Sequence, residues 1–311
     1  MEQLVILGSG CAGMTAAIYA ARAQLEPLVF SGADIGGQLA LTTSVENYPG
    51  FPQGVMGAEL TDDFRKQAEQ FGARVQRAAV TEVALVAGGP HRLTLSTGES
   101  VETKALIVAT GARPRWLDLP SEQALRNKGV SSCATCDGAL YRDVPVVVVG
   151  GGDSAVEEAL FLTRFASQVT IIHRRDELRA SKILRDRAHQ HEKIAFCWDA
   201  IVEEVLDVTQ DDVTGVVVRN VKTDQRSTVD CKAVFVAIGH LPNTDLFNGL
   251  MALDDAGYVV LSAGDRSFTS VDGVFAAGDC ADHVYRQAVT AAGMGCRAAI
   301  DAERWLAQQT A

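Results

Sequence analysis

The sequence lacks the features that direct a chain into or through a membrane. No segment approaches the run of about 20 apolar residues that a transmembrane helix needs. The N-terminus, Met1-Glu2-Gln3, has no basic segment, and the apolar run Leu4–Leu7 ends at Gly8, which is too short for a secretory signal. From these absences we expect a cytoplasmic protein.

Basic residues are scarce as well. The 28 lysines and arginines are outnumbered by 39 aspartates and glutamates, which gives a formal net charge of −11. This balance argues against a general affinity for nucleic acid or anionic lipid. The 311 residues are enough for two ordinary domains, each with its own buried interior.

Cysteines are too few and too scattered for a disulfide scaffold. Of the seven, only Cys133 and Cys136 are close in sequence. A zinc site would need a second close cysteine pair or a Cys/His pair at ligand spacing, and the only candidates are His189 and His191 with Cys197. We interpret these three as a solvated helix end and a buried thiol, and expect no metal.

A strand, a glycine loop and a helix follow one another at two places. The first copy is Leu4–Leu7, loop 8–13, helix Met14–Ala23 and strand Pro27–Phe30. The second copy is Val146–Val149, loop 150–155, helix Val156–Phe165 and strand Gln168–Ile172. Two such units, roughly 140 residues apart, indicate two dinucleotide sites.

Each unit also contains a predicted antiparallel hairpin. The hairpins are Val80–Leu85 with Arg92–Ser96, and Val213–Asn220 with Ser227–Lys232. An apolar strand ending in glycine follows each, at Gly111 and Gly239, and a third such strand runs from Gly273 to Asp279. We therefore predict an α/β protein with two Rossmann-like three-layer nucleotide-binding domains, in which residues 113–242 are inserted between 1–112 and 243–311.

The residues after each glycine loop distinguish the two ligands. A glycine loop lets the backbone approach a pyrophosphate, and the following helix N-terminus attracts its charge. His173, Arg174, Arg175 and Arg179 stand where a 2′-phosphate is recognised, so the second site should prefer NADPH over NADH. Asp34 stands at the matching place in the first unit, which suits FAD, with Asp279 as a ligand of the ribitol hydroxyls or a helix N-cap.

The Cys133 and Cys136 pair is predicted at the start of a helix. Ser131 and Ser132 before it are good N-caps, and a helix N-terminus favours the reactive thiolate. A Cys-x-x-Cys can also be half of a metal site or an accident of sequence, but beside two nucleotide loops it indicates redox chemistry. Asp137 could exchange protons with the thiols, or be an ordinary solvated carboxylate.

Taken together, these motifs closely resemble the small, bacterial-type NADPH-dependent thioredoxin reductases over essentially the whole chain. The motifs are Gly8-Ser-Gly-Cys-Ala-Gly13, Gly36-Gly-Gln-Leu39, Val45-Glu-Asn-Tyr-Pro-Gly50, Ala109-Thr-Gly111, Cys133-Ala-Thr-Cys-Asp-Gly138, Gly150-Gly-Gly-Asp-Ser-Ala-Val-Glu-Glu-Ala159, His173-Arg-Arg-Asp176, Arg179-Ala-Ser-Lys182, Ile238-Gly-His240, Gly278-Asp279 and Tyr285-Arg-Gln-Ala288. Cys11 replaces a proline frequent in that family, and we expect the chain to end at Ala311 without an added thioredoxin domain.

The resemblance implies a homodimer in which NADPH reduces FAD, FAD reduces the Cys133–Cys136 disulfide, and the dithiol reduces oxidised thioredoxin. Cys136 would be the thiol next to the flavin, Cys133 the attacking thiol and Asp137 the acid–base residue. FAD would be held by Gly8, Ser9, Gly10, Ala12, Gly13, Ser31, Gly32, Ala33, Asp34, Gly36, Gly37, Gln38, Asn47, Thr110, Gly111, Gly278, Asp279, Arg286, Gln287 and Ala288. NADPH would be held by Gly150, Gly152, Asp153, Ser154, His173, Arg174, Arg175, Arg179, Ile238, Gly239 and His240.

The resemblance also implies a rotation between the two domains, with Ala112–Arg115 and His240–Asn243 as hinge candidates. The same two-domain fold is compatible with other functions: a flavin dithiol oxidase, a ferredoxin-fed reductase, a ferredoxin–NADP reductase relative, and a flavoprotein that senses NADPH or redox state. The first two would not need the His-Arg-Arg motif, and the third would lack the cysteine pair. The sensor is not distinguished by sequence.

Overall fold

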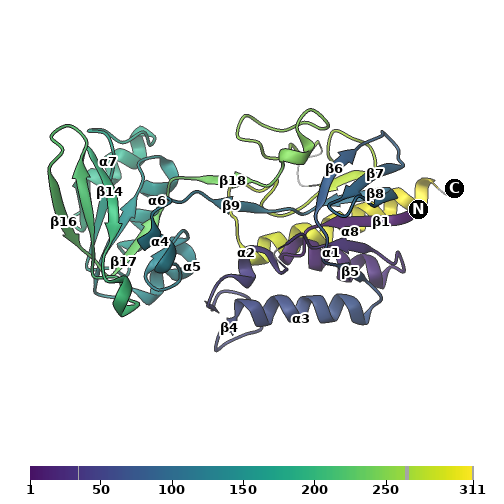
Figure 1. Cartoon of the computed structure of the whole chain (residues 1–311), viewed down its shortest axis with the longest axis horizontal. Coiled ribbons are helices and arrows are strands. Elements are labelled where there is room, and N and C mark those ends of the chain that lie inside the picture. Colours follow the sequence, from purple (N-terminus) through teal and green to yellow (C-terminus); the bar gives the residue numbers. More distant parts are fainter. Residues whose placement is uncertain (34, 263–265, 310–311) are drawn as a thin grey trace. The chain divides into compact units, whose positions relative to one another are not determined.

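The computed structural model describes residues 1–33, 35–262 and 266–309, so Asp34 lies outside the described residues (Figure 1). The chain divides into two compact units, Met1–Arg113 with Leu241–Ala311 as unit 1, and Pro114–His240 as unit 2. These divisions lie one and two residues from the predicted boundaries at 112/113 and 242/243. No described helix combines the length and the apolar character needed to cross a membrane.

Unit 1 is built on a seven-stranded sheet of order β5-β2-β1-β8-β7-β6, with β19 paired to β8. The strands are β1 (Glu2–Leu7), β2 (Leu28–Phe30), β5 (Arg74–Gln76), β6 (Val80–Ala84), β7 (His91–Leu95), β8 (Ser100–Val108) and β19 (Val274–Ala276). Strands β5, β2, β1, β8 and β19 are parallel, β7 is antiparallel to its neighbour β8, and β6 is antiparallel to β7. Because β1 and β8 are covered on both faces, they are apolar throughout their inner parts rather than alternating.

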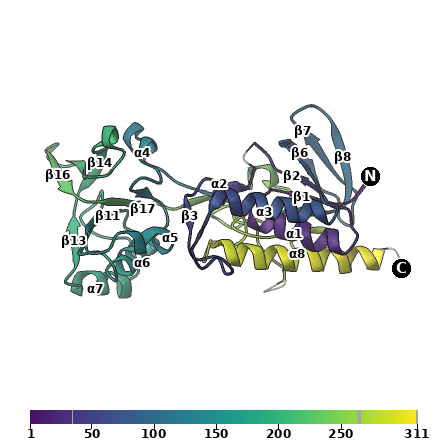
Figure 2. The same cartoon turned by 90° about the horizontal axis from the view of Figure 1, so that it is seen from below.

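Two helices cover one face of this sheet. Helix α1 (Cys11–Arg22) and helix α8 (Ala288–Gln309) lie side by side, as Figure 2 shows. Their contact surface is made of small residues, and a Cβ atom on Gly295 of α8 would overlap the backbone of Ala12 in α1. Helix α3 (Gly57–Gln70) packs on α1 from the other side. Alanine and glycine in these helices therefore serve close packing.

The remaining short elements of unit 1 are α2 (Gly37–Ala40), η3 (Asp245–Phe247), and the paired strands β3 (Ser44–Val45) and β4 (Val55–Met56).

Unit 2 contains a five-stranded parallel sheet of order β10-β17-β11-β12-β13. Its strands are β10 (Val130–Ser131), β11 (Pro145–Val149), β12 (Gln168–Ile172), β13 (Ile194–Cys197) and β17 (Ala233–Val236). Its helices are α4 (Pro120–Ala124), α5 (Ala134–Asp137), η1 (Gly138–Leu140), α6 (Asp153–Leu162), α7 (Lys182–Gln190) and η2 (Val208–Gln210). A three-stranded antiparallel sheet, β14 (Ala200–Val205), β15 (Gly215–Asn220) and β16 (Arg226–Asp230), completes the unit.

The chain passes between the two units twice, along strands that pair with each other. Strand β9 (Ala112–Pro114) carries it from unit 1 to unit 2, and β18 (His240–Pro242) carries it back. Both predicted hinge segments fall on this pair of strands.

Most predicted strands agree closely with the structure, and β12 has the predicted bounds, but both long helices after the glycine loops begin earlier than predicted. Helix α1 begins at Cys11 instead of Met14, and α6 begins at Asp153 instead of Val156. The N-caps are Gly10 and Gly152. The last residues of each predicted loop therefore already form the first helical turn. The glycines make the connection short enough for this turn to begin close to the strand end.

Candidate nucleotide and redox sites

The first glycine loop joins β1 to α1, and its three glycines have different surroundings. A Cβ on Gly8 would overlap the carbonyl of Ala109, and a Cβ on Gly13 would overlap the carbonyl of Gly8. A Cβ on Gly10 would meet only the Gly36 carbonyl oxygen, at 3.8 Å. Gly8 and Gly13 therefore allow the chain to pack on itself, whereas the backbone at Gly10 is left open, as the approach of a pyrophosphate would require.

The register of the sheet gathers the other predicted FAD residues at one edge. Leu7 pairs with both Phe30 and Val108, and Val108 pairs with Ala276, so four parallel strands end together. The segments that follow these strand ends contain Gly8, Ser31, Gly32, Ala33, Thr110, Gly111, Gly278 and Asp279. The carboxyl edge of a parallel sheet is where such folds bind ligands.

Ser9 has a structural role in this loop. Its hydroxyl oxygen accepts the N–H of Gly36 over 3.0 Å, and both groups are buried. This bond fixes the segment of Gly36, Gly37 and Gln38, which starts α2, against the first glycine loop. Asn47 and Gln287 also meet, since Asn47 Nδ2 donates to Gln287 Oε1 over 3.4 Å. Two predicted residues that are 240 positions apart are thereby brought together.

One carboxylate oxygen of Asp279 is available to a ligand. Its Oδ1 is buried and makes no hydrogen bond with the described residues. Burial raises the pKa of Asp279 to about 6, the Asp282 charge adds to the rise, and Arg286 opposes it. It lies in a turn and not at a helix start, so the N-cap interpretation is wrong. An unpartnered acceptor at this edge fits a ligand hydroxyl donor, such as a ribitol hydroxyl.

The second glycine loop repeats the first in unit 2. A Cβ on Gly150 would overlap the carbonyl of Ala237, whereas a Cβ on Gly152 would meet no atom within 4 Å. Ser154 is exposed at the start of α6. The Asp153 carboxylate is used inside the protein, because its Oδ1 accepts the N–H of Ser181 over 2.7 Å. The Gly152 backbone, like that of Gly10, is left open, as the approach of a pyrophosphate would require.

The predicted 2′-phosphate residues surround the end of β12. His173 is buried, its ring lies against Gly151, and its Nε2 has no partner among the described residues. Burial lowers the pKa of His173, and the nearby Arg179, Arg175 and Arg174 charges lower it further. The three arginine side chains are exposed. Three cations beside a neutral histidine suit a phosphate dianion.

The sheet register also brings the cysteine pair to this edge. Val149 pairs with Ile172 and Val236, and Ser131 pairs with Phe235, one residue earlier. The loop at Gly150, the turn at His173 and the segment after Ser131 therefore follow strands that end at the same side. Ile238, Gly239 and His240 follow the end of β17 at this edge as well.

Cys133 and Cys136 form a disulfide with a Cα–Cα distance of 5.3 Å. The Cys136 N–H lies 3.2 Å from the Cys133 sulfur. The N-cap of the short helix α5 is Cys133, so the prediction that a serine caps it was wrong. Ser131 belongs to β10, and its hydroxyl accepts the N–H of Cys133 over 3.0 Å. The hydroxyl is thus used to shape the turn before the helix.

Asp137 follows the disulfide directly, and its acidity is altered. Burial raises the pKa of Asp137, and a hydrogen bond from Ser131 partly opposes the rise. A carboxyl with a raised pKa keeps its proton to higher pH and can return it to a thiolate nearby. The sequence predicts Ser131 only as a helix N-cap. Its contact with Asp137 depends on the shape of the turn between β10 and α5, which the sequence motif alone does not reveal.

Asn243 is predicted from the sequence only as the end of a hinge segment, but it also contacts the FAD-side turn. Its Nδ2 donates to the Thr110 carbonyl over 2.9 Å, and its Oδ1 accepts from Arg113 over 2.7 Å. It therefore fixes the Thr110-Gly111 turn at the FAD edge. Its place in Gly-His-Leu-Pro-Asn, just after β18, was the available signal.

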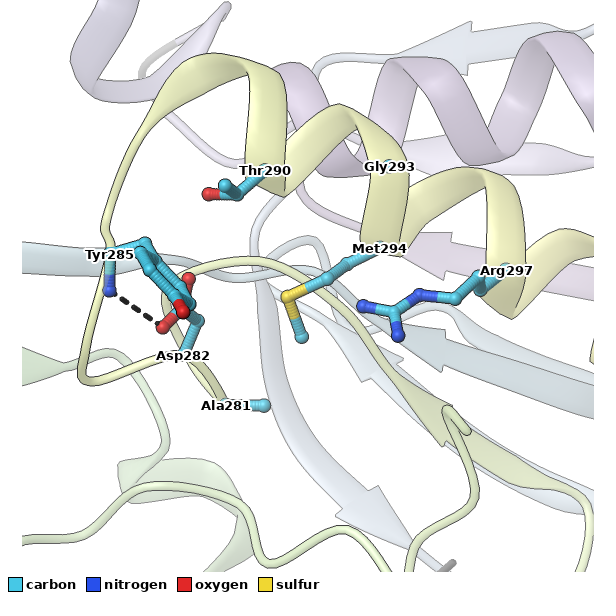
Figure 3. Close-up of a pocket in the computed structure, with 7 residues that line it drawn as sticks. All are labelled: Ala281, Asp282, Tyr285, Thr290, Gly293, Met294 and Arg297. Carbon is cyan, nitrogen blue, oxygen red and sulfur yellow. Dashed lines mark hydrogen bonds between the residues drawn. The ribbon is translucent and has the colours of Figure 1, made fainter. Parts of the chain in front are cut away.

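One cavity of about 580 Å³ lies in unit 1, between the 281–285 loop and one face of α8 (Figure 3). Thr290, Met294 and Arg297 project from the helix toward Tyr285, whose N–H donates to Asp282 over 2.9 Å. None of the predicted cofactor residues lines it. Across the described ranges there is no group of three or more His, Cys, Asp and Glu side chains suited to a metal ion.

The chain is similar to known proteins over nearly its whole length. Residues 2–295 match the family model described as pyridine nucleotide-disulphide oxidoreductase. A thioredoxin reductase of Mycolicibacterium smegmatis is 54% identical over 309 residues, covering 99% of this chain and 98% of that protein. The solved thioredoxin reductases of Giardia duodenalis and Streptococcus pyogenes are 42% and 40% identical, with TM-scores of 0.93 and 0.92 and 98% coverage of both chains.

Proposed function

Because the chain belongs to the pyridine nucleotide-disulphide oxidoreductase family, and its full-length relatives are thioredoxin reductases, we propose that it uses NADPH to reduce the disulfide of thioredoxin. Electrons would reach the partner through the Cys133–Cys136 pair. The observation that carries this proposal is the placement of that disulfide in unit 2, at the same sheet edge as a glycine loop bordered by three arginines.

Unit 1 is the proposed FAD domain. The open backbone at Gly10 would face the pyrophosphate, and the unpartnered Asp279 Oδ1 would accept a ribitol hydroxyl. The fixed turns at Gly36 and Thr110 would border the same edge. A bound flavin would supply the step that converts hydride transfer from a nicotinamide into reduction of a disulfide.

Unit 2 is the proposed NADPH domain. Gly152 leaves room for the pyrophosphate, and Arg174, Arg175 and Arg179 would hold the 2′-phosphate. A guanidinium suits this task because it cannot lose its charge and presents two parallel N–H groups to phosphate oxygens. NADH lacks the 2′-phosphate and would gain little from these three residues.

The thiols would act by exchange. The Cys133 thiolate attacks one sulfur of the oxidised partner, and the partner's other sulfur leaves as a thiolate that takes up a proton. Cys136 then attacks Cys133, which releases the partner as a dithiol and restores the Cys133–Cys136 disulfide. Two electrons and two protons pass to the partner in all. Asp137, whose raised pKa keeps it protonated to higher pH, is placed to hold and return one of these protons.

Cysteine variants test this route. With Cys133→Ser or Cys136→Ser, NADPH oxidation that depends on added oxidised thioredoxin should fall by at least about a thousandfold, since a single thiol cannot complete the exchange. The flavin absorbance should still disappear when NADPH is added. Cys296→Ser, which changes a free cysteine of α8, is the matched control and should turn over normally.

Undiminished thioredoxin reduction by either variant would contradict the proposed route. NADPH oxidation by the parent protein that needs oxygen and ignores thioredoxin would favour the dithiol oxidase instead. A binding protein that only senses redox state would show no steady NADPH consumption under any of these conditions.

We also propose that the protein is a cytoplasmic homodimer, as the family resemblance implies. Sedimentation equilibrium of the flavin-loaded protein should give twice the mass of one chain, and a single-chain mass at all concentrations would contradict it.

A further inference from the structure

Three cations at the proposed 2′-phosphate site have no partner, although an acidic residue directly follows two of them. Among the described residues, Arg174, Arg175 and Arg179 make no side-chain hydrogen bond or ion pair. Asp176 comes next in the chain and is exposed. Its carboxylate would be the natural partner for these arginines, so something must hold it elsewhere.

Lys222 is what holds Asp176. Its Nζ lies 2.8 Å from Asp176 Oδ2 and 2.9 Å from Asp199 Oδ2, so one ammonium group bridges two carboxylates. The hydrogen bond from Lys222 lowers the pKa of Asp176. Asp199 is the less exposed of the two carboxylates, with 16% of its side chain accessible against 73% for Asp176. The more buried Asp199 therefore anchors the lysine, which in turn restrains the freer Asp176.

The hairpin that carries Lys222 is itself attached to the arginine turn. Lys222 lies between β15 and β16, where the Asn220 side-chain oxygen accepts the N–H of Lys222 over 2.9 Å. The N–H of Val221 donates to the Asp199 carbonyl over 2.6 Å, and the N–H of Asp199 donates to the Arg175 carbonyl over 3.1 Å. A continuous set of backbone bonds thus runs from the hairpin to Arg175.

We propose that Lys222 is a positioning residue for coenzyme selectivity, which holds Asp176 away from Arg174, Arg175 and Arg179 and so keeps them available for a 2′-phosphate. This inference rests on the proposed NADPH site. Without Lys222, the Asp176 carboxylate is released beside the arginines, where it pairs with them and repels the phosphate. The loss should concern the 2′-phosphate alone, because the released carboxylate competes for the arginines assigned to that phosphate and not for the Gly152 backbone.

The test is the binding of two small probes to the flavin-loaded full chain, measured by calorimetry at low salt. Adenosine 2′,5′-bisphosphate carries the 2′-phosphate, and 5′-AMP is the same molecule without it. Lys222→Met should weaken binding of the bisphosphate about two- to fivefold, the range of an exposed ion pair, and leave 5′-AMP binding unchanged. The effect should shrink in high salt, because exposed charges are screened.

Two further variants separate positioning from a simple loss of charge. Lys232→Met removes an equally charged, similarly exposed lysine that pairs with Asp212 at 3.2 Å, near the opposite end of β11, and should change neither affinity. Adding Asp176→Asn to Lys222→Met should restore bisphosphate affinity, because the competing carboxylate is then gone.

Three outcomes would overturn the inference: equal weakening of both probes, an equal effect of Lys232→Met, or no rescue by Asp176→Asn. If the unaltered protein binds the bisphosphate no more tightly than 5′-AMP, the NADPH assignment itself fails and this inference fails with it. If that preference is intact and Lys222→Met leaves it unchanged, only the role of Lys222 is disproved.

Discussion

Asp279 combines an unsatisfied carboxylate oxygen with surroundings that favour its neutral form. The pKa of its carboxyl rises to about 6 from an ordinary value of 3.8. A pKa raised by folding means that the native state binds the proton more tightly than the unfolded state. Without cofactor, its contribution to stability is therefore complete below pH 4 and is lost as the pH rises through 6. A residue that costs stability at neutral pH indicates a binding role.

Replacing this carboxyl should separate stability from cofactor binding. At pH 7.5, Asp279→Asn should raise the free energy of unfolding of the cofactor-free protein by about 1 to 2 kcal/mol, and the gain should vanish at pH 4. The same change should weaken flavin binding at least about tenfold, because an amide is a poorer acceptor for a ligand hydroxyl. Denaturant titrations and flavin fluorescence measure the two effects.

Asp255→Asn is the matched control for this prediction. It removes one negative charge from an exposed position of the same unit. Both the free energy of unfolding and the flavin affinity should be unchanged. If Asp279→Asn behaved like this control, Asp279 would have no special part in the site.

At the scale of the element, each glycine loop contains glycines in tight contacts and one glycine beside open space. A Cβ at Gly13 would overlap the Gly8 carbonyl and force α1 away from β1, whereas a Cβ at Gly152 would enter open space. Gly13→Ala should therefore lower the free energy of unfolding by about 2 to 4 kcal/mol.

Gly152→Ala should change ligand binding much more than the stability of the fold. Its backbone φ of −90° suits alanine, so the fold should lose at most about 1 kcal/mol, mainly through a poorer N-cap. Binding of 5′-AMP and of NADPH should weaken together, since the methyl group occupies the approach of the pyrophosphate. Thermal unfolding and calorimetry give both numbers, and a Gly152→Ala protein with unchanged affinity would show that no ligand approaches there.

The elements that sequence reasoning located are those with strong local signals. Runs such as Val146–Val149 must be strands because they are apolar throughout and end in glycine. The short strands β3, β4, β9 and β18 were not predicted, because two or three residues carry no periodicity. The cap of α5 was assigned wrongly for a different reason: side-chain preference favours serine, but the Ser131 hydroxyl is occupied by the N–H of Cys133.

For the whole molecule, the two-unit organisation followed from the repeated glycine loops and the return of the chain at Gly273–Asp279. The contact of Lys222 with Asp176 could not be predicted, because it joins the tip of one hairpin to the turn after a strand, 46 residues earlier. Sequence spacing predicts which residue types face a ligand. It does not reveal which neighbours keep them in place.

Unit 2 should fold without unit 1. Its two ends, Pro114 and His240, lie on the paired strands β9 and β18, so excision leaves adjacent termini and an intact five-stranded sheet. A chain of residues 114–240 should unfold cooperatively and bind adenosine 2′,5′-bisphosphate within about twofold of the full protein. Circular dichroism and calorimetry test this. A disordered fragment would mean that unit 2 depends on unit 1 for its stability.

The double crossing of the chain has a consequence for proteolysis. A protease that cuts only β9 produces two peptides, yet the first of them contains β8, which remains paired in unit 1 with β19 of the second. Helices α1 and α8 hold the same two peptides together. A singly nicked molecule should therefore elute from a sizing column as the uncut protein does and separate into fragments only in detergent.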